Sequence, residues 1–431
     1  MKKVLLINPN RKRDEQFLQV ELLPPLGLAY LAAVLEQNGC QVDILDNYLF
    51  NLPHEEIVRM AKFYDTVGIS ILTSTSLEAI AMAKLIKNKH LICGGPHATL
   101  FPQQMLPYFD TVVVGESEMV IADVVLNERT RVVYGTTIDT LDMLPLPARD
   151  KLPMVMYPKK NEFLKADRVF SMNTSRGCPY LCSFCSVKMI WGKTYRAFSP
   201  EYVYNEIKYL IENYNANGIY FREDNFTYDR KRVEGICELI APFGLEWVCE
   251  SRVEQLDERL IKLMAKSGCR GMWFGTESGS NRVLKMLHKG TNTERAIETF
   301  RLCKKHGIKT GASFMLGLPG ETKEEMYETL RFAHSLDSYW TWFNYFLGIP
   351  GSDLYADIIK NKSYERLDDR GFAYVKVADM TSTEMIQFHR WIKFLYHIKK
   401  PVRIWRTLRQ LPPKTWILAI LKLVGIYKGR L

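Results

Sequence analysis

Short apolar stretches alternate with helical patterns along this chain, and this alternation constrains the fold more than any other feature. In the first third the strand-like stretches are residues 4–7, 42–45, 67–72, 91–93 and 111–114, and the helical stretches are residues 26–38, 54–63, 76–87 and 102–108. Strands that alternate with crossover helices form parallel sheets. We therefore predict a doubly wound parallel α/β domain over residues 1–131, with a ligand at the carboxyl ends of its strands.

The alternation resumes after a proline-rich linker, which we assign to residues 132–168. The predicted strands of the second run are residues 170–173, 218–221, 246–250, 271–275, 309–316 and 342–347, and its helices are residues 200–214, 232–241, 257–267, 293–306 and 323–335. Six strands with crossover helices predict a partial (β/α)6 barrel of the TIM type over residues 169–370. Chemistry in such barrels takes place at the carboxyl ends of the strands.

Three cysteines follow the first strand of the second run in the spacing C-x3-C-x2-C, at Cys178, Cys182 and Cys185. Three thiolates on one tight loop can hold three irons of a cubic iron–sulfur cluster and leave the fourth iron without a protein ligand. A zinc knuckle is the alternative, but it needs a fourth Cys or His close by. The next cysteine is Cys237, far along the chain. We therefore predict a catalytic metal cluster on these three cysteines.

The loop SRGCPYLCSFCS, with Phe184 just before the third cysteine, resembles the signature of the radical S-adenosylmethionine (SAM) enzymes. The resemblance implies a [4Fe–4S] cluster whose open iron binds SAM. It also implies a 5′-deoxyadenosyl radical that removes a hydrogen atom from the substrate. The electron would come from a reducing partner such as flavodoxin or ferredoxin.

The first domain is similar to the cobalamin-binding domain that precedes the radical domain in one subgroup of that family. The matching segments are SILTSTS, GGPHAT and GESE, which follow the third, fourth and fifth predicted strands. The resemblance implies that these loops hold cobalamin through Ser74, Gly94, Gly95, His97, Gly115 and Glu116. A dehydrogenase-type nucleotide fold is the rival, but it requires G-x-G-x-x-G where this chain has Asn8-Pro9-Asn10.

Many cobalamin domains carry D-x-H-x-x-G, whose histidine ligates cobalt, and this chain departs from that pattern. It reads Asp46-Asn47-Tyr48-Leu49-Phe50-Asn51 after the second strand, so we expect no cobalt ligation by a histidine of that motif. His97 either approaches the cofactor or only caps the turn formed by the two glycines. Some proteins with this layout keep the domain without using cobalamin.

Polar or small residues also follow the strands of the predicted barrel. The candidates for binding SAM are Glu223, Asp224, Arg252, Glu277 and Gly317. By resemblance, Glu223 and Asp224 lie near the methionyl group. Arg252 can clamp a carboxylate, Glu277 can accept hydrogen bonds from the ribose or the amine, and Gly317 lets the backbone approach the adenosyl group. The alternative for each acidic residue is a charge at the start of a helix.

The net charge of +10 arises at the C-terminus, because the chain from residue 385 onward holds 11 Lys or Arg and no acidic residue. We predict a basic amphipathic segment over residues 371–431. Basic residues mixed with Trp and Leu favour a helix at a membrane interface, whereas nucleic acid is disfavoured by the apolar content. A helix docked on the barrel is the third alternative.

Scattered cysteines indicate a reducing cytosol, and we expect a cytoplasmic protein with peripheral contact at the inner membrane face.

These features together predict a cobalamin-dependent radical SAM methyltransferase that acts on an unactivated carbon of a hydrophobic small molecule or lipid. The strand of residues 339–346 is unusually aromatic, and one of its faces can hold such a substrate while the other packs in the core. Radical cyclisation, oxidation or rearrangement without methyl transfer is the alternative. A corrinoid carrier or sensor is disfavoured by the open three-cysteine site. A methylthiotransferase acting on RNA would need more cluster cysteines than Cys40 and Cys93 in the first domain.

Overall fold

The computed structural model describes residues 1–10, 22–157 and 159–399. Most of the predicted basic tail, residues 400–431, lies outside the described residues, so a membrane-interface helix there stays a prediction. The chain divides into two compact units. The first comprises Met1–Lys160, Phe170–Pro179 and Val187–Asn215, and the second comprises Asn161–Val169, Tyr180–Ser186 and the chain from Ala216 onward. The domain boundaries at residues 131, 168 and 370 likewise stay predictions.

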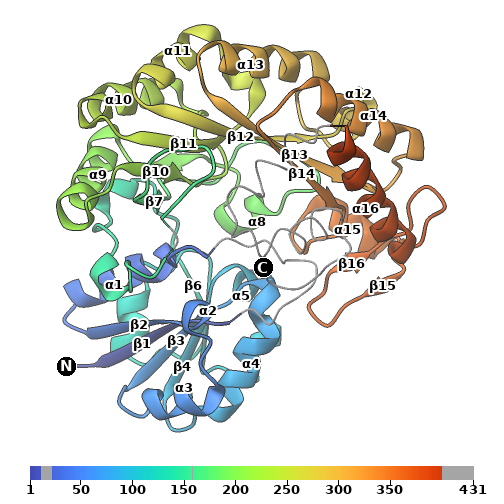
Figure 1. The fold of residues 1–431 in the computed structure, drawn as a ribbon. Coiled ribbons are helices and arrows are strands. Elements are labelled where there is room, and N and C mark those ends of the chain that lie inside the picture. The colour runs from blue at the N-terminus through green and yellow to red at the C-terminus, as the bar shows by residue number, and fades with distance from the viewer. Residues whose placement is uncertain (11–21, 158, 400–431) are drawn as a thin grey trace, which may run out of the picture. The chain divides into compact units, whose positions relative to one another are not determined.

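A parallel sheet forms the centre of the first unit (Figure 1). Its strands within the described residues are β1 (Lys3–Asn8), β2 (Gln41–Asp46), β3 (Thr66–Ser70), β4 (His90–Gly94), β5 (Thr111–Val114) and β6 (Arg131–Tyr134), in the order β2-β1-β3-β4-β5-β6. The doubly wound fold is thereby confirmed. The pattern predicted five strands, and β6 is a sixth that pairs with β5 where we placed the start of the linker. This edge strand is only four residues long and half-buried.

Helices cover both faces of this sheet. They are α1 (Leu26–Gln37), α2 (Asn47–Phe50), α3 (His54–Ala61), α4 (Ser76–Leu85), α5 (Pro96–Leu100), α6 (Pro102–Met105) and α7 (Ile121–Leu126). Successive residues of a strand point to opposite faces, and in β1 Leu5 packs with α3 and α4 while Leu6 packs with α1 and α7. Because both faces are buried, these strands are continuous apolar runs, as is typical of parallel sheets.

The first unit also contains the chain on both sides of the cysteine loop. A two-residue strand, β8 (Ser175–Arg176), pairs antiparallel with β9 (Arg196–Ala197), and helices α8 (Val187–Trp191) and α9 (Pro200–Tyr214) follow. The sequence predicted α9 but neither short strand. Two-residue strands are too short for their periodicity to be detected.

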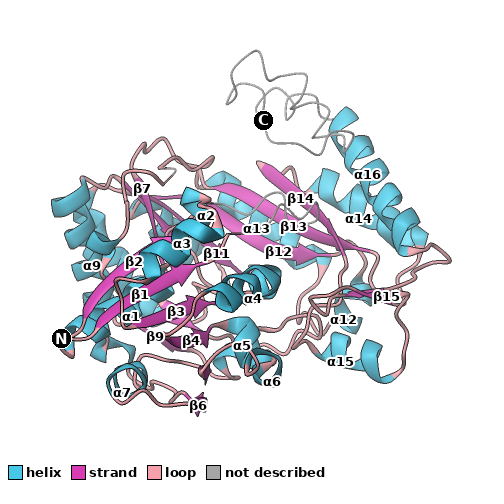
Figure 2. Ribbon diagram, turned by 90° about the horizontal axis from the view of Figure 1, so that it is seen from below, coloured by secondary structure: helices cyan, strands magenta, loops and turns pink. Residues whose placement is uncertain are grey.

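A curved sheet in the order β14-β13-β12-β11-β10-β7 forms the second predicted domain (Figures 1 and 2). Its strands are β7 (Val169–Met172), β10 (Gly218–Phe221), β11 (Glu246–Ser251), β12 (Cys269–Glu277), β13 (Lys309–Leu316) and β14 (Trp340–Tyr345). The strands from β10 to β14 run parallel. The predicted partial barrel is thereby confirmed.

The helices of the second unit begin at side-chain caps that the sequence supplies. They are α10 (Arg230–Ile240), α11 (Glu258–Lys266), α12 (Asn281–Met286), α13 (Thr293–Lys305), α14 (Lys323–Ser335), α15 (Asp353–Lys360) and α16 (Ser382–Ile398), with a hairpin of β15 (Arg366–Leu367) and β16 (Ala373–Tyr374). Asp257, Asn292 and Thr322 accept N–H groups of the first turns of α11, α13 and α14. Each such cap contributes about 1 kcal/mol, which fixes where the helices start. None of the helices in the described ranges has the length and apolar character needed to cross a membrane.

The aromatic strand β14 starts two residues before the predicted strand and ends before Phe346. Its outward residues pack against α16: Thr341 and Tyr396 join their hydroxyl groups at 2.5 Å, and the rings of Phe343 and Tyr396 lie 5.1 Å apart. The His389 ring bonds the carbonyl of Phe343 at 2.6 Å. The described part of the predicted tail is therefore a helix docked on the barrel, with one face of β14 in the core.

Candidate active site

The part of the cysteine loop that belongs to the second unit, Tyr180–Ser186, is held by backbone contacts within that unit. The N–H of Cys185 donates to the carbonyl of Cys182 at 3.1 Å. The N–H of Ser183 donates to the carbonyl of Leu287 at 3.0 Å, and the carbonyl of Ser183 accepts from the N–H of Leu354 at 2.8 Å. None of the three cysteines takes part in a disulfide bond; Cys182 is 6% exposed, and Cys178 and Cys185 are half-buried. No three His, Cys, Asp or Glu side chains of the described chain form a ready metal site. The loop therefore supplies the donors for a cluster without their final arrangement.

Arg252, directly after β11, places a positive charge on the cysteine loop. Its Nη1 donates to the Sγ of Cys182 at 3.3 Å, and its guanidinium lies 3.7 Å from the ring centroid of Tyr180. Burial opposes its charge, but Glu254 and Cys182 outweigh burial and raise the pKa of Arg252. A permanent cation that donates to a thiolate stabilises its charge, as partners of metal ligands commonly do. The donor set therefore fits a cluster.

Glu277, the last residue of β12, is linked to the same arginine through Lys289. Its Oε1 accepts from the Nζ of Lys289 at 2.9 Å, and the carbonyl of Lys289 accepts from Arg252. Both Glu277 and Lys289 are at most 8% exposed. A Cβ at Gly275 would lie 2.4 Å from the Glu277 carboxylate, so this glycine leaves room for the pair. Sequence reasoning missed Lys289, because no pattern marks a single lysine after a helix as buried.

Carboxylates gather at the ends of β10 and β11. Glu223 is buried, and Glu250 accepts from the hydroxyl of Tyr220 at 2.7 Å. Asp224 keeps exposed area, yet the surrounding protein desolvates it, and this effect with the charges of Glu250 and Glu223 raises the pKa of Asp224 to about 6. Asn225 is fully buried, and its amide atoms have no hydrogen-bond partner among the described residues. An unpaired buried amide calls for a partner. In the sequence Asn225 stands out as an amide beside two carboxylates at a strand end, but we did not include it among the predicted site residues.

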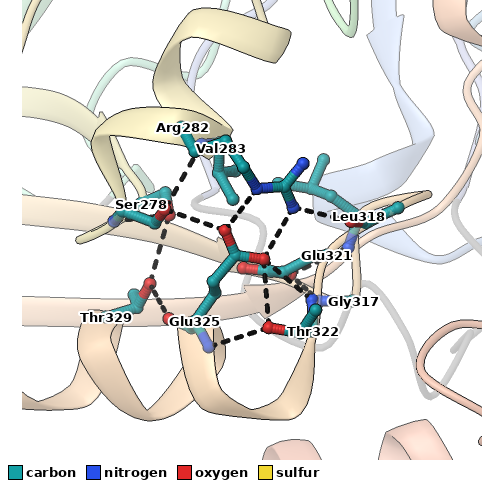
Figure 3. Close-up of polar contacts among 11 residues, drawn as sticks. Ser278, Arg282, Val283, Gly317, Leu318, Glu321, Thr322, Glu325 and Thr329 are labelled. Atoms are coloured by element: carbon teal, nitrogen blue, oxygen red, sulfur yellow. Dashed lines mark hydrogen bonds and ion pairs between the residues drawn. The ribbon is translucent and has the colours of Figure 1, made fainter.

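Gly317 lies in a tight turn that Glu321 holds in place, as Figure 3 shows. The Oε2 of Glu321 accepts the N–H groups of Gly317 at 2.7 Å and Leu318 at 3.0 Å. Gly317 has φ +77°, and a Cβ there would lie 2.7 Å from the Sδ of Met385. Burial raises the pKa of Glu321 to about 7, although the two backbone bonds oppose that rise. Glu321 thus shapes the turn after β13.

A cavity of about 220 Å³ lies in the first unit at the carboxyl ends of β3, β4 and β5. Gly94, Gly95, Gly115 and Glu116 line it, together with apolar side chains of the sheet and of α1. Gly95 has φ +93°, and a Cβ there would lie 3.1 Å from the backbone of Ile71. Apolar walls and bare glycine backbone fit a flat heterocycle. The cavity can therefore take part of a cofactor as large as cobalamin.

Two of the predicted cofactor residues do not line this cavity. His97 is 2% exposed; its Nδ1 lies 3.4 Å from the Oγ1 of Thr73, and its ring packs 5.1 Å from that of Phe101. Burial lowers the pKa of His97 to about 4, so the ring is neutral at pH 7. Ser74 lies in a short turn of Thr73–Thr75. Four predicted residues thus share the cavity while Ser74 and His97 lie outside its lining.

Comparison with known proteins identifies both regions. A Radical SAM superfamily model matches residues 172–333, and a B12 binding domain model matches residues 20–125. An uncharacterized methyltransferase of Pyrococcus horikoshii is 31% identical over 93% of this chain and 94% of its own length. The chain belongs to the cobalamin-binding radical SAM enzymes. The cofactors of this radical SAM enzyme are a [4Fe–4S] cluster, SAM and cobalamin.

Other relatives of this radical SAM enzyme differ in the reactions that their names state. Cytidylyl-2-hydroxyethylphosphonate methyltransferase of Streptomyces wedmorensis is 27% identical over 83% of this chain and 82% of its own length. Anaerobic magnesium-protoporphyrin IX monomethyl ester cyclase of Rubrivivax gelatinosus is 28% identical over 78% of this chain and 66% of its own length. The relatives therefore include methyltransferases and a cyclase.

Solved structures share the fold of this radical SAM enzyme. OxsB, described with aqua-cobalamin and SAM bound, has a TM-score of 0.74 at 15% identity and covers 100% of this chain and 76% of its own. TsrM from Kitasatospora setae, described with cobalamin and a [4Fe–4S] cluster bound, has a TM-score of 0.67 at 19% identity over 85% and 76% of the two chains. At these sequence identities the structural similarity shows that the chain has the same fold as OxsB and TsrM.

Proposed function

We propose that this enzyme transfers a methyl group to an unactivated carbon of a hydrophobic small molecule or lipid. The observation that carries the proposal is that one chain combines a glycine-lined cavity in a B12 binding domain with a three-cysteine loop in a radical SAM domain. The methyltransferase of Pyrococcus horikoshii, which aligns over nearly its whole length, supports the same reaction class.

The residues of the barrel would bind and orient two of the cofactors. Cys178, Cys182 and Cys185 would hold the cluster, and Arg252 would hydrogen-bond the Cys182 sulfur. We propose SAM contacts for Glu223, Asp224, Arg252, Glu277 and Gly317. Carboxylates suit the amino group and the ribose hydroxyls, and the bare backbone of Gly317 suits the adenosyl group. When bound, the cofactors supply a 5′-deoxyadenosyl radical and a transferable methyl group.

The first unit would hold cobalamin. We propose that Gly94, Gly95 and Gly115 admit it to the cavity by shape, with Glu116 beside them, and that Ser74 and His97 support the surrounding turns. His97 carries no charge at pH 7 and is enclosed by Thr73 and Phe101, so it acts as a neutral support for the glycine turn.

The inward face of the aromatic strand supports an apolar substrate. Trp342 of β14 and Trp273 of β12 are half-buried, with ring centroids 6.3 Å apart at 69°. A Cβ at Gly311 would lie 2.2 Å from the indole of Trp273. The absence of a side chain at Gly311 therefore lets the indole lie flat on β13. Exposed aromatic area on the inner side of a barrel binds apolar molecules.

The proposal also includes two partners: flavodoxin or ferredoxin as the reductant, and a membrane surface contacted through residues 371–431.

Radical cyclisation without methyl transfer is the second candidate. The cyclase of Rubrivivax gelatinosus, which aligns with 78% of this chain, favours it. The two candidates share every cofactor contact proposed above and differ in the products that SAM leaves.

The deciding experiment is anaerobic reconstitution with iron, sulfide and hydroxocobalamin, followed by turnover with SAM labelled in its methyl group. We expect about four irons per chain, near-equal cobalamin and protein, and a labelled product formed with both 5′-deoxyadenosine and S-adenosylhomocysteine. A changed but unlabelled substrate, with 5′-deoxyadenosine alone, would replace methyl transfer by cyclisation or rearrangement.

A further inference from the structure

The cobalamin cavity is not built from the B12 binding domain alone. Ile190 and Trp191 of α8 also line it, and α8 contacts α5, the helix that follows Gly95. The B12 binding domain model ends at residue 125, and α8 falls within the radical SAM match. Since α8 starts at Val187, only Ser186 separates it from Cys185. One wall of the cavity is therefore the direct continuation of the cysteine loop.

The other end of the cysteine loop is tied to the same cavity by charge. Glu116, in the cavity wall, accepts from Arg176 Nη1 at 2.7 Å and from Arg196 Nη1 at 3.0 Å, and Arg176 also pairs with Glu118. Arg176 lies two residues before Cys178. Between them, Gly177 has φ +81°, and a Cβ there would lie 2.3 Å from the carbonyl of Thr194, so the backbone is closely fitted at this end too.

The two arginines could not occupy this position without Glu116. They are directly opposite each other in the β8–β9 pair, and like charges in that arrangement repel. All members of the network are at most 8% exposed, so the repulsion is not screened by water. The arginine pair also surrounds Trp191: the Arg176 guanidinium lies 5.1 Å from its ring centroid, and Arg196 donates to its carbonyl at 3.3 Å.

We infer that Glu116, Arg176, Arg196 and Trp191 act as positioning residues that couple cobalamin binding to the iron–sulfur loop. A ligand that fills the cavity presses on α8 and on the Glu116 carboxylate, and these two elements set the backbone on each side of the cysteines. Each cofactor then strengthens the binding of the other by the same factor, because coupling between two sites is reciprocal. The inference uses the cofactors of the family and does not depend on whether the reaction is methyl transfer or cyclisation.

The test is a binding cycle on the full-length wild-type protein. Hydroxocobalamin affinity is measured anaerobically by absorbance for the cluster-free and the cluster-loaded protein, and the electron paramagnetic resonance spectrum of the reduced cluster is recorded with and without cobalamin. We expect cobalamin to bind at least about fivefold tighter when the cluster is loaded, and to change the spectrum. Equal affinities together with an unchanged spectrum would overturn the inference without any variant.

Glu116→Gln tests the network, and Glu206→Gln is its matched control. Glu206 pairs with Arg149 at 2.6 Å in the same unit, is equally buried and does not line the cavity. The quantity compared is the cobalamin affinity of the cluster-loaded protein divided by that of the cluster-free protein. We expect Glu116→Gln to reduce this ratio to near one, while Glu206→Gln keeps the wild-type ratio. A wild-type ratio in Glu116→Gln, or an equal loss in both variants, would show that the network does not carry the coupling.

Trp191→Leu tests the wall without removing a charge, and it serves if Glu116→Gln does not fold. We expect about tenfold weaker cobalamin binding and loss of the cobalamin-induced spectral change, with iron content unchanged. Unaltered cobalamin binding in this variant would show that α8 does not contribute to the cobalamin site. No substrate or turnover enters these measurements, so their failure is distinct from a failure of the proposed reaction.

Discussion

The two parallel sheets of this chain carry different kinds of residues at the carboxyl ends of their strands. In the first unit β4 and β5 are followed by Gly94-Gly95 and Gly115, which leave a cavity between backbone and apolar side chains. In the second unit β11 is followed by Arg252 and β12 ends at Glu277, and both residues are buried in a chain of charged contacts. We propose that the first edge holds its ligand by shape, so added atoms should weaken binding there. The second depends on paired charges, so the removal of one partner should harm it.

The largest effect expected at the charged edge follows from removing a cluster donor. Cys182→Ala should abolish iron binding at the site and all 5′-deoxyadenosine formation, because two thiolates do not retain the cluster. Iron analysis after reconstitution and product chromatography measure both. Cys237→Ala, which removes a buried thiol of α10, is the control and should behave as wild type. Retained SAM cleavage in Cys182→Ala would refute the radical assignment.

The two regions should also respond to pH in opposite directions. Burial lowers the pKa of His97 from 6.5 to about 4, so its contribution to stability is complete above pH 6.5 and is lost as pH falls toward 4. Burial raises the pKa of Glu321 from 4.5 to about 7, so its contribution is complete below pH 4.5 and is lost as pH rises through 7. Each of these differences between the ordinary pKa and the pKa in the folded protein corresponds to on the order of 3 kcal/mol of unfolding free energy.

Urea unfolding of the cofactor-free protein between pH 4 and 8 measures these two contributions. His97→Gln should flatten the acid side of the stability profile, and Glu321→Gln should flatten the neutral side. If both variants changed the same side of the profile, the contrast between the two regions would not hold.

Removing the charge of Arg252 sharpens the comparison further. Arg252→Met keeps the apolar stem of the side chain but leaves Cys182 without its donor, and we expect about 10- to 100-fold less 5′-deoxyadenosine formation. The cobalamin affinity of the cluster-free variant should stay within about twofold of wild type. Arg230→Met, which breaks an ion pair with Asp257 at the surface, should change neither quantity. A large loss of cobalamin affinity in Arg252→Met would contradict the division between shape and charge.

The smallest effect is expected at the glycine edge. Gly95→Ala adds one methyl group 3.1 Å from the Ile71 backbone in a left-handed conformation, a strain of roughly 1–3 kcal/mol. We expect about tenfold weaker cobalamin binding by equilibrium dialysis, with normal cluster loading in the absence of cobalamin. Gly39→Ala has a similar φ of +78° but lies outside the cavity, and it should leave cobalamin binding unchanged.

The sequence predicted the repeating parts of the fold because burial on both faces gives each strand a continuous apolar run. The bounds of α9, β10, β13 and α14 agree with their patterns to the residue. It did not predict β6, β8, β9 or α12, which are short, so packing rather than periodicity decides their structure.

The candidate site was predictable where residues follow a strand and not where they are recruited from elsewhere. Gly94 and Glu277 are the last residues of β4 and β12, and the structure places them in the cavity and in the charged chain. Lys289 and Arg196 are equally buried, but each meets a partner that the fold brings close, 12 residues away for Lys289 and 80 for Arg196. A local pattern cannot show such a partner.

The pairing of Glu116 with Arg176 and Arg196 limits how such chains can be recombined. The acid is encoded before the proline-rich segment and the two bases after it, so a gene fusion made at that segment would separate them. A chimera that takes residues 1–168 from a protein without an acid at position 116 would bury two arginines without their partner, an arrangement that costs several kcal/mol. Successful module exchange in this family should therefore carry the arginine hairpin and α8 together with the sheet, with crossover points after α9.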